Sequence, residues 1–254
     1  MAPCSPRRCS TGTSADVDFW ALRRDDTALH RLAAEFVGTF GLVFAGTGAV
    51  IINSVTDGGV SHVGIGLTFG LIIMVMIYAF GHVSGAHFNP AVTLAFATGR
   101  HFPWLLVPQY WAAQLAGGIT ASLVHRALFG DVAHLGATLP LGSASQSFGL
   151  EIVLTLILMV VITSVATDTR AVGQAAAIAI GGTIGLEALF AGPISGASTN
   201  PARSLAPAIV SGTWQDQWLY VAGPAIGAVA GVLLHNWIRN GDPAVPAGGE
   251  GDQR

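Results

Sequence analysis

The sequence has few charged residues and no lysine. Charged residues make up 10% of its 254 residues and hydrophobic residues 52%, with a mean hydropathy of +0.60. An ordinary soluble domain has about 25% charged residues. A soluble monomer of this composition would precipitate, and disorder is excluded because the apolar residues occur in several long runs. We therefore expect a membrane protein that crosses the bilayer several times.

Two further scarcities exclude other classes of function. Cys4 and Cys9 are the only cysteines, so the sequence has no CxxC pair, zinc-ligand spacing or disulfide framework. All eleven basic residues are arginine and the net charge is −3, which leaves no basic stripe for a nucleic-acid backbone. The sequence also lacks a nucleophile–base pair and a phosphate-binding loop. We expect neither an enzyme nor a nucleic-acid-binding protein, and no cofactor.

Six apolar stretches are long enough to cross about 30 Å of hydrocarbon, and within a bilayer they must be helices. They cover residues 32–53, 62–80, 104–129, 148–167, 171–191 and 217–238. Residues 1–30 lack the apolar core of a secretory signal and are expected to form a flexible cytoplasmic leader. We expect a single membrane domain at 31–239 and a cytoplasmic tail at 240–254.

Two apolar pieces, residues 89–98 and 200–210, are too short to span, and each begins with Asn-Pro-Ala. The sequence Ser-Gly-Ala-His-Phe-Asn-Pro-Ala at 84–91 recurs 111 residues later as Ser-Gly-Ala-Ser-Thr-Asn-Pro-Ala, identical at six of eight positions. Three spans separate the copies, so the two halves enter the bilayer in opposite senses. The chain is predicted to be an inverted repeat, with one half at about 31–129 and the other at about 148–239.

The distribution of arginine predicts the orientation. Six spans place both termini on one side of the membrane, and nine of the eleven arginines fall on that side; Arg126 and Arg203 lie opposite. Cytoplasmic loops carry an excess of basic residues. We therefore expect a multi-pass protein of the plasma or inner cell membrane with both termini in the cytoplasm.

Asn-Pro-Ala before an apolar run starts a helix, because Asn is a favoured N-cap and Pro fits the first helical position. In an inverted repeat, two such half-helices enter from opposite faces and meet near the midplane. Each N-terminus carries about half a positive charge, which repels cations. The amides of Asn89 and Asn200 are able to donate hydrogen bonds to a neutral molecule. The alternative is a pair of ordinary capped turns.

Charged residues within the predicted membrane segments are informative because they are costly there. Arg203 lies in the first turn of the second half-helix, where the helix dipole disfavours a cation. It is either a fixed charge that lines a constriction or an arginine that reaches solvent at the outer mouth. Glu35 and Glu151 lie near the start of the first span of each half, whereas Glu187 has no assigned role.

These motifs resemble those of the major intrinsic protein family, the aquaporins and aquaglyceroporins, over about residues 31–239. The resemblance rests on residues 84–93, on Gly-Pro-Ile-Ser-Gly-Ala at 192–197 and on Asn-Pro-Ala-Arg-Ser at 200–204. Residues 189–198 and Tyr-Val at 220–221 are most similar to nodulin-like intrinsic proteins and their bacterial relatives. The resemblance implies an all-α channel with six transmembrane helices and two re-entrant half-helices. It also implies a homotetramer in the lipid bilayer, with one pore per subunit.

The resemblance further implies the residues of the pore. The two Asn-Pro-Ala motifs would form its centre. An outer constriction of four residues would act as a selectivity filter. Two acids would brace the loops that lead to the half-helices. The implied residues are Asn89, Pro90, Ala91, Asn200, Pro201 and Ala202 in the motifs, Phe69, Ala188, Ala197 and Arg203 in the filter, and Glu35 and Glu151 as support.

Two of the four filter positions are alanine, and water-selective relatives carry His at the position of Ala188, so we expect a wide pore. Glycerol facilitators carry Asp where this chain has Ser204. The pattern favours a passive channel for water and small uncharged solutes, with glycerol, boric acid and arsenous acid as candidates, that excludes ions and protons. A water-selective channel, an inverted-repeat secondary transporter and a purely structural tetramer are the alternatives. A transporter normally needs an ionisable residue at the midplane, where this chain has Asn89 and Asn200.

Overall fold

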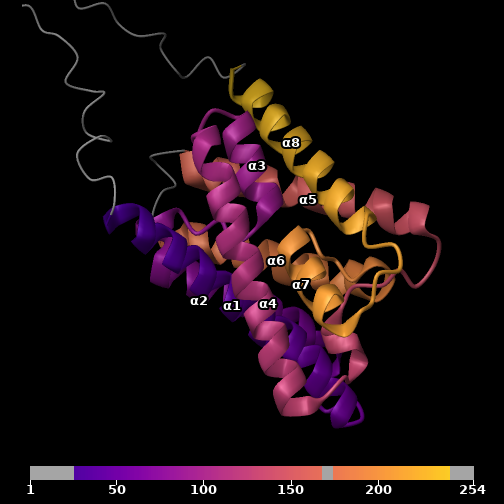
Figure 1. Cartoon of the computed structure of the whole chain (residues 1–254). Helices are drawn as coiled ribbons and strands as arrows, with labels where there is room; N and C mark the ends of the chain where they lie inside the picture. The colour runs from indigo at the N-terminus through magenta and orange to yellow at the C-terminus, as the bar shows by residue number, and fades with distance from the viewer. Residues whose placement is uncertain (1–25, 168–173, 241–254) are drawn as a thin grey trace, which may run out of the picture.

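The computed structural model describes residues 26–167 and 174–240, and every element in this part of the chain is helical (Figure 1). Most of the expected leader and tail lies outside the described residues. The elements are α1 (Asp26–Val55), α2 (Ser61–Ser84), α3 (Pro90–Thr98), η1 (Trp104–Leu106), α4 (Val107–Phe129), η2 (Ala133–Gly136), α5 (Ala144–Thr167), α6 (Gln174–Ser195), α7 (Pro201–Ser211) and α8 (Leu219–Asn240).

Each predicted span coincides with a long helix, and the two short segments form α3 and α7. Within the described part of the chain, five helices are long and apolar enough to cross a membrane. The sixth, α4, has 23 residues and is about 35 Å long, but it is less apolar. Its polar side chains Gln114, Ser122 and His125 are buried inside the protein, so they do not meet lipid. The prediction of six spans and two half-helices is confirmed.

The two halves of the chain pack in the same way. In the first half α1 packs against α2 and α4, and in the second α5 packs against α6 and α8. The half-helices exchange partners, because α3 packs against α8 and α7 packs against α4. The helices α2 and α6 pack against each other between the halves. Each half-helix is therefore held by a long helix of the other repeat.

Glycines allow the long helices to approach closely. A Cβ atom on Gly70 of α2 would lie 2.6 Å from the carbonyl oxygen of Gly181 on α6. A Cβ atom on Gly231 of α8 would lie 2.7 Å from the carbonyl oxygen of Leu156 on α5. Real side chains cannot approach a backbone so closely, so small residues are required at these crossings.

Apolar side chains cover the outside of the helices, whereas polar ones gather inside. Exposed examples are Leu71 and Val75 on α2 and Leu186 and Phe190 on α6. The buried polar residues include Glu35, Thr39, Asn89, Gln114, Glu151, Asn200 and Arg203. An apolar exterior of this kind suits a chain surrounded by lipid, and the interior contains polar residues beside its apolar clusters.

Candidate functional site

The loop that enters α3 is bonded to a buried carboxylate on α1. Oε1 of Glu35 accepts hydrogen bonds from Ser84 Oγ (2.7 Å) and from the backbone N–H of His87 (2.9 Å). Oε2 accepts from the backbone N–H of Phe88 (2.8 Å) and from Gln114 Nε2 (2.7 Å). A buried charge is tolerated only with such donors. The carboxylate thus joins the loop to both α1 and α4.

The second repeat contains the same arrangement. Oε1 of Glu151 on α5 accepts from Ser195 Oγ and from the backbone N–H of Ser198, both at 2.9 Å. Oε2 accepts from the backbone N–H of Thr199 at 2.8 Å. The two loops are therefore held in equivalent positions, and the half-helices begin at equivalent points.

Both half-helices begin at the Asn of an Asn-Pro-Ala motif. Asn89 has extended backbone angles, and its Oδ1 accepts from the backbone N–H of Ala91 at 2.9 Å. Asn200 does the same for Ala202 at 2.9 Å and for Arg203 at 3.3 Å. In each case the proline occupies the start of the helix, where no N–H is needed. Pro90, Ala91, Pro201 and Ala202 are all buried.

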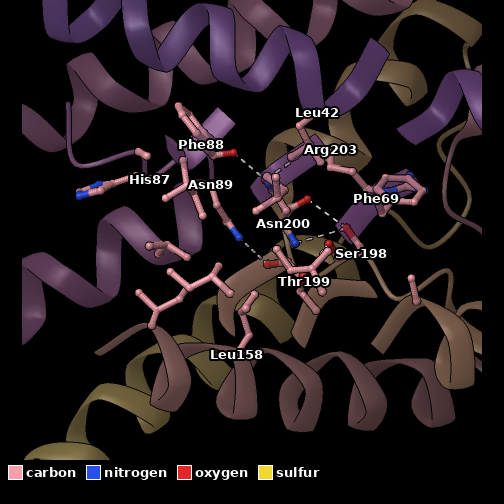
Figure 2. Close-up of a pocket in the computed structure, with 18 of the residues that line it drawn as sticks. Leu42, Phe69, His87, Phe88, Asn89, Leu158, Ser198, Thr199, Asn200 and Arg203 are labelled. Carbon is pink, nitrogen blue, oxygen red and sulfur yellow. Dashed lines mark hydrogen bonds between the residues drawn. The ribbon is translucent and has the colours of Figure 1, made fainter. Parts of the chain in front are cut away.

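The tips of the half-helices are joined by reciprocal hydrogen bonds (Figure 2). Nδ2 of Asn89 donates to the carbonyl oxygen of Thr199 at 2.7 Å, and Nδ2 of Asn200 donates to the carbonyl oxygen of Phe88 at 2.9 Å. Each asparagine thus bonds the residue that precedes the other. This contact excludes two unrelated capped turns. An amide group has two N–H donors, and the reciprocal bond uses one of them.

Positive groups gather at the tips of the half-helices. The first turns of α3 and α7 contain no acidic residue. Each helix N-terminus contributes about half a positive charge, and Arg203 adds a full one in the first turn of α7. The carboxylates of Glu35 and Glu151 bond the loops that lead to the half-helices and do not line the cavity. Two dipoles and a guanidinium therefore disfavour cations at this point.

Phe69, Ala188, Ala197 and Arg203 line the same cavity as Asn89 and Asn200. They come from α2, α6, the loop before α7, and α7, so four separate parts of the chain meet there. The cavity has a volume of about 80 Å³. A single water molecule needs about 10–15 Å³ of such space. The cavity therefore has room for several water molecules.

Arg203 is buried within this cavity and is only 5% exposed. Its Nη1 donates to the carbonyl oxygen of Gly136 at 2.9 Å, and its guanidinium carbon lies 4.9 Å from the centre of the Phe69 ring. The hydrogen bond and the cation–π contact hold the charge in a defined position. The alternative of an arginine that extends into outer solvent is thereby excluded.

The acceptor at Gly136 was not identified from the sequence. It ends η2, in which Ala133, His134 and Leu135 also have positive φ angles between 49° and 54°. Gly136 has φ of +75°, and a Cβ atom there would lie 2.6 Å from Thr47 Cβ. Only glycine suits both conditions. No local motif predicts the bond to Arg203, because the partners are 67 residues apart in sequence.

The apolar walls of the cavity follow the inverted repeat. Ile73 and Ile77 on α2 correspond to Ile184 and Ala188 on α6, and both helices contribute further apolar side chains to the lining. The isoleucines of the lining were not predictable from the sequence, because hydropathy does not distinguish a pore-facing from a lipid-facing side chain. At the position equivalent to Arg203, the first repeat contributes Val92.

The helix α4 contacts both half-helices near their ends. The indole N–H of Trp111 donates to the carbonyl oxygen of Pro90 in the first turn of α3, at 3.0 Å. Arg126 Nη1 donates to the carbonyl oxygen of Val210 in the last turn of α7. One long helix therefore fixes the start of one half-helix and the end of the other.

One further polar residue lines the cavity, and another precedes a lining residue in the sequence. His87 lines the cavity, with Nδ1 3.1 Å from Thr93 Oγ1 and its ring packed against Phe96 and Tyr110. It is thus a hydrogen-bonded loop histidine.

Glu187 is 2% exposed, and neither carboxylate oxygen has a hydrogen-bond partner among the described residues. It directly precedes Ala188 in the sequence.

The fold and site define a membrane channel built from an inverted repeat, with two half-helix tips in contact at its centre. The family model for the major intrinsic proteins matches residues 23–235. The chain belongs to the major intrinsic protein family, and it is a channel for water and small solutes and not an enzyme.

Similar proteins place it near the nodulin-like intrinsic proteins within that family. It is 53% identical to "Aquaporin NIP1-3" of Oryza sativa subsp. japonica over 211 residues, covering 83% of this chain and 74% of the rice protein. It is 49% identical to "Aquaporin NIP3-1" of Arabidopsis thaliana over 222 residues, covering 84% and 68%. The X-ray structure of the aquaglyceroporin from Plasmodium falciparum is similar with a TM-score of 0.76 and 25% identity, covering 84% of this chain and 97% of that one.

Proposed function

We propose that this channel passes water and small uncharged hydroxylated solutes, such as glycerol, boric acid and arsenous acid, and excludes ions and protons. The observation that carries this proposal is the shared cavity. Phe69, Ala188, Ala197 and Arg203 line it together with Asn89 and Asn200. We infer that the four residues form the selectivity filter and that the asparagines form the centre of the pore.

The filter combines an apolar face with fixed hydrogen-bond donors. Ala188 and Ala197 leave space, and the ring of Phe69 offers a surface for the carbon side of a polyol. The guanidinium of Arg203 has five N–H donors, of which the bond to Gly136 uses one. A solute with hydroxyl groups along one side of an apolar skeleton matches both surfaces. This arrangement supports solutes larger than water.

At the centre of the pore, the side-chain amides of Asn89 and Asn200 supply further hydrogen-bond donors. After the reciprocal bonds between the tips, each amide retains a second N–H to donate to a passing oxygen atom. Cations, including hydronium, meet two helix N-termini and Arg203, with no acid in the first turn of either helix. We infer that the same groups attract neutral oxygen atoms and repel cations.

The reciprocal bonds also favour a channel over an alternating-access transporter. A transporter moves one repeat against the other, and such movement would break the bonds of Asn89 to Thr199 and of Asn200 to Phe88. The half-helices are further held by the long helices of the opposite repeat. A fixed path accounts for these contacts without any energy coupling.

We also propose the assembly and orientation of the protein. The expected state is a homotetramer in the plasma or inner cell membrane, with both termini in the cytoplasm and one channel domain of about 31–239 per subunit. The distribution of arginine supports the orientation. Cross-linking of purified protein measures the subunit number, and protease protection of tagged termini in sealed vesicles measures the orientation.

The test is stopped-flow light scattering on vesicles that contain purified protein, with water, glycerol and boric acid as separate permeants. We expect flux for all three. Ala188→His should lower glycerol flux about tenfold and water flux much less, because the imidazole fills the filter; such a change corresponds to about 1.4 kcal/mol in the barrier. Ala188→Ser is the near-isosteric control and should retain glycerol flux.

Three outcomes would contradict the proposal. Water flux without glycerol or boric acid flux would indicate a water-selective channel. Saturable uptake driven by an ion gradient would indicate a transporter. Unchanged glycerol flux in Ala188→His would remove Ala188 from the filter.

A further inference from the structure

A proline near the outer end of α6 leaves one backbone carbonyl without its helical partner. Pro193 lies inside α6, which continues to Ser195. Proline has no N–H, so the carbonyl of Leu189, four residues earlier, receives no helical hydrogen bond from it. Backbone carbonyls freed by proline in a membrane helix commonly accept from donors on neighbouring helices.

A histidine from another helix supplies that donor. Nε2 of His62, in the first turn of α2, lies 2.6 Å from the carbonyl oxygen of Leu189. A carbonyl oxygen only accepts, so the ring nitrogen must carry the proton in this bond. The two residues are 127 apart in sequence. The bond therefore joins the outer ends of α2 and α6 directly.

This bond lies next to two residues of the filter. Leu189 directly follows Ala188 on α6, and Phe69 lies seven residues after His62, on the same face of α2. Between them on that face, Gly66 packs against Leu189; a Cβ atom there would lie 2.9 Å from Leu189 Cδ2. The helices are thus in contact at this level, and the bond limits how far their outer ends separate.

The helix α2, which is the equivalent of α6 in the first repeat, has no proline at the corresponding position among the described residues. The position equivalent to Pro193 is His82 on α2, which carries a backbone N–H and continues the helix. Of the two equivalent helices α2 and α6, α6 thus has a carbonyl left open by proline, at the end of the pore that contains Arg203 and Ala188. This location relates the bond to selectivity and not to the general packing of the repeat.

We propose that His62 is a positioning residue of the selectivity filter. By occupying the carbonyl of Leu189, it fixes the separation between the helices that carry Phe69 and Ala188, and so it limits the size of solute that passes. The proposal rests on the filter assignment made above and adds a residue outside the cavity. Loss of the bond should reduce discrimination between solutes by size.

The first experiment measures the permeability ratio of erythritol to glycerol in vesicles. We expect His62→Phe to raise this ratio about threefold, as the loss of one net hydrogen bond implies. His62→Gln should retain the wild-type ratio, because its side-chain amide is able to donate to the same carbonyl. His82→Phe, an exposed histidine at the other end of α2, is the matched control and should also retain it.

The second experiment restores the helical donor. Pro193→Ala returns an N–H to the position that bonds the Leu189 carbonyl, so His62→Phe should have no further effect on the ratio in that background. The proposal is overturned if His62→Phe leaves the ratio unchanged, or if it raises the ratio equally with and without Pro193→Ala.

A readout that does not depend on solute flux separates this proposal from the function proposed above. Amide hydrogen exchange in the outer turns of α6, residues 186–195, should be faster in His62→Phe and unchanged in His82→Phe. If wild-type vesicles show no glycerol flux, the proposed solute range is wrong, and the exchange rates still test the bond. Equal exchange in His62→Phe and wild type overturns the positioning role.

Discussion

The two repeats share a backbone arrangement but differ in the side chains that face the pore. Glu35 and Glu151 bond the loops in the same way, and Asn89 and Asn200 start equivalent half-helices. At the position where the second repeat has Arg203, the first has Val92. The features that the repeats share thus form the frame of the pore, and the side chains that differ between the repeats give its two ends different chemistry.

This difference makes the pore asymmetric along its axis. The end formed by the second half-helix contains a fixed charge bonded to Gly136 and in contact with Phe69. The wall around Val92 includes Phe96 and Ile162, which are apolar. One end of the cavity thus offers a fixed hydrogen-bond donor, whereas the section around Val92 is apolar.

The largest effect is expected for the buried acid that each repeat has in its first long helix, Glu35 in α1 and Glu151 in α5. Glu35→Ala would leave the donors on Ser84, His87, Phe88 and Gln114 without their acceptor, whereas Glu151→Ala would leave three donors. Each buried unsatisfied donor costs about 1–3 kcal/mol. We expect Glu35→Ala to lose at least about 4 kcal/mol of stability and Glu151→Ala somewhat less. Thermal unfolding in detergent measures both.

The stability comparison of Glu35→Ala with Glu151→Ala needs a control variant, and one result would contradict it. Thr155→Ala, whose hydroxyl bonds only within α5, should change the unfolding temperature little. A greater loss in Glu151→Ala than in Glu35→Ala would show that the number of donors does not determine the contribution of each acid.

A smaller effect is expected at the position where the repeats differ, which is Arg203 in the second and Val92 in the first. Arg203→Val makes the second repeat resemble the first at this position. A charge about 8 Å away in a medium of effective dielectric about 20 contributes about 2 kcal/mol to the barrier for a cation, so we expect proton leak to rise about thirtyfold. A pH-sensitive dye inside vesicles measures the leak. Val92→Leu is the control at the equivalent position, and an equal leak in both variants would refute the assignment of ion exclusion to Arg203.

The smallest effect concerns Glu187. Its equivalent in the first repeat is Met76, which lies against Gly41 of α1. Since the carboxylate of Glu187 has no donor among the described residues, Glu187→Met should raise the stability by about 1 kcal/mol and leave glycerol flux at the wild-type level. The unfolding temperature in detergent measures this. A lower unfolding temperature would mean that the carboxylate has a stabilising partner in the membrane.

Much of the fold was predictable because its signals are local. Hydropathy located the six long helices within a few residues, and the length of two apolar segments identified them as half-helices. Asn followed by Pro marked where α3 and α7 begin, and both helices start at the proline. The opposite orientation of the repeats followed from the number of spans between the motifs.

The contacts that shape the site were not predictable in the same way, because they join residues far apart in sequence. Gly136 binds Arg203 from a short helical turn that carries no motif, and His62 bonds a carbonyl on another helix. The isoleucines of the pore wall have the same hydropathy as residues that face lipid. Glu187 was noticed as unusual, but nothing in the sequence showed that its carboxylate has no donor.

The sequence by itself determined which segments enter the membrane, where the half-helices start and which residue types are available to a pore, because burial of a backbone in lipid and the capping of a helix are local requirements. The tertiary structure alone decided how those residues meet. Three contacts depend on the packing of separate helices. They are the reciprocal bonds of Asn89 and Asn200 to the opposite loops, the contact of Arg203 with Phe69, and the bond from His62 to the carbonyl of Leu189. Such packing is set by the complementarity of whole surfaces, and no single segment contains that information.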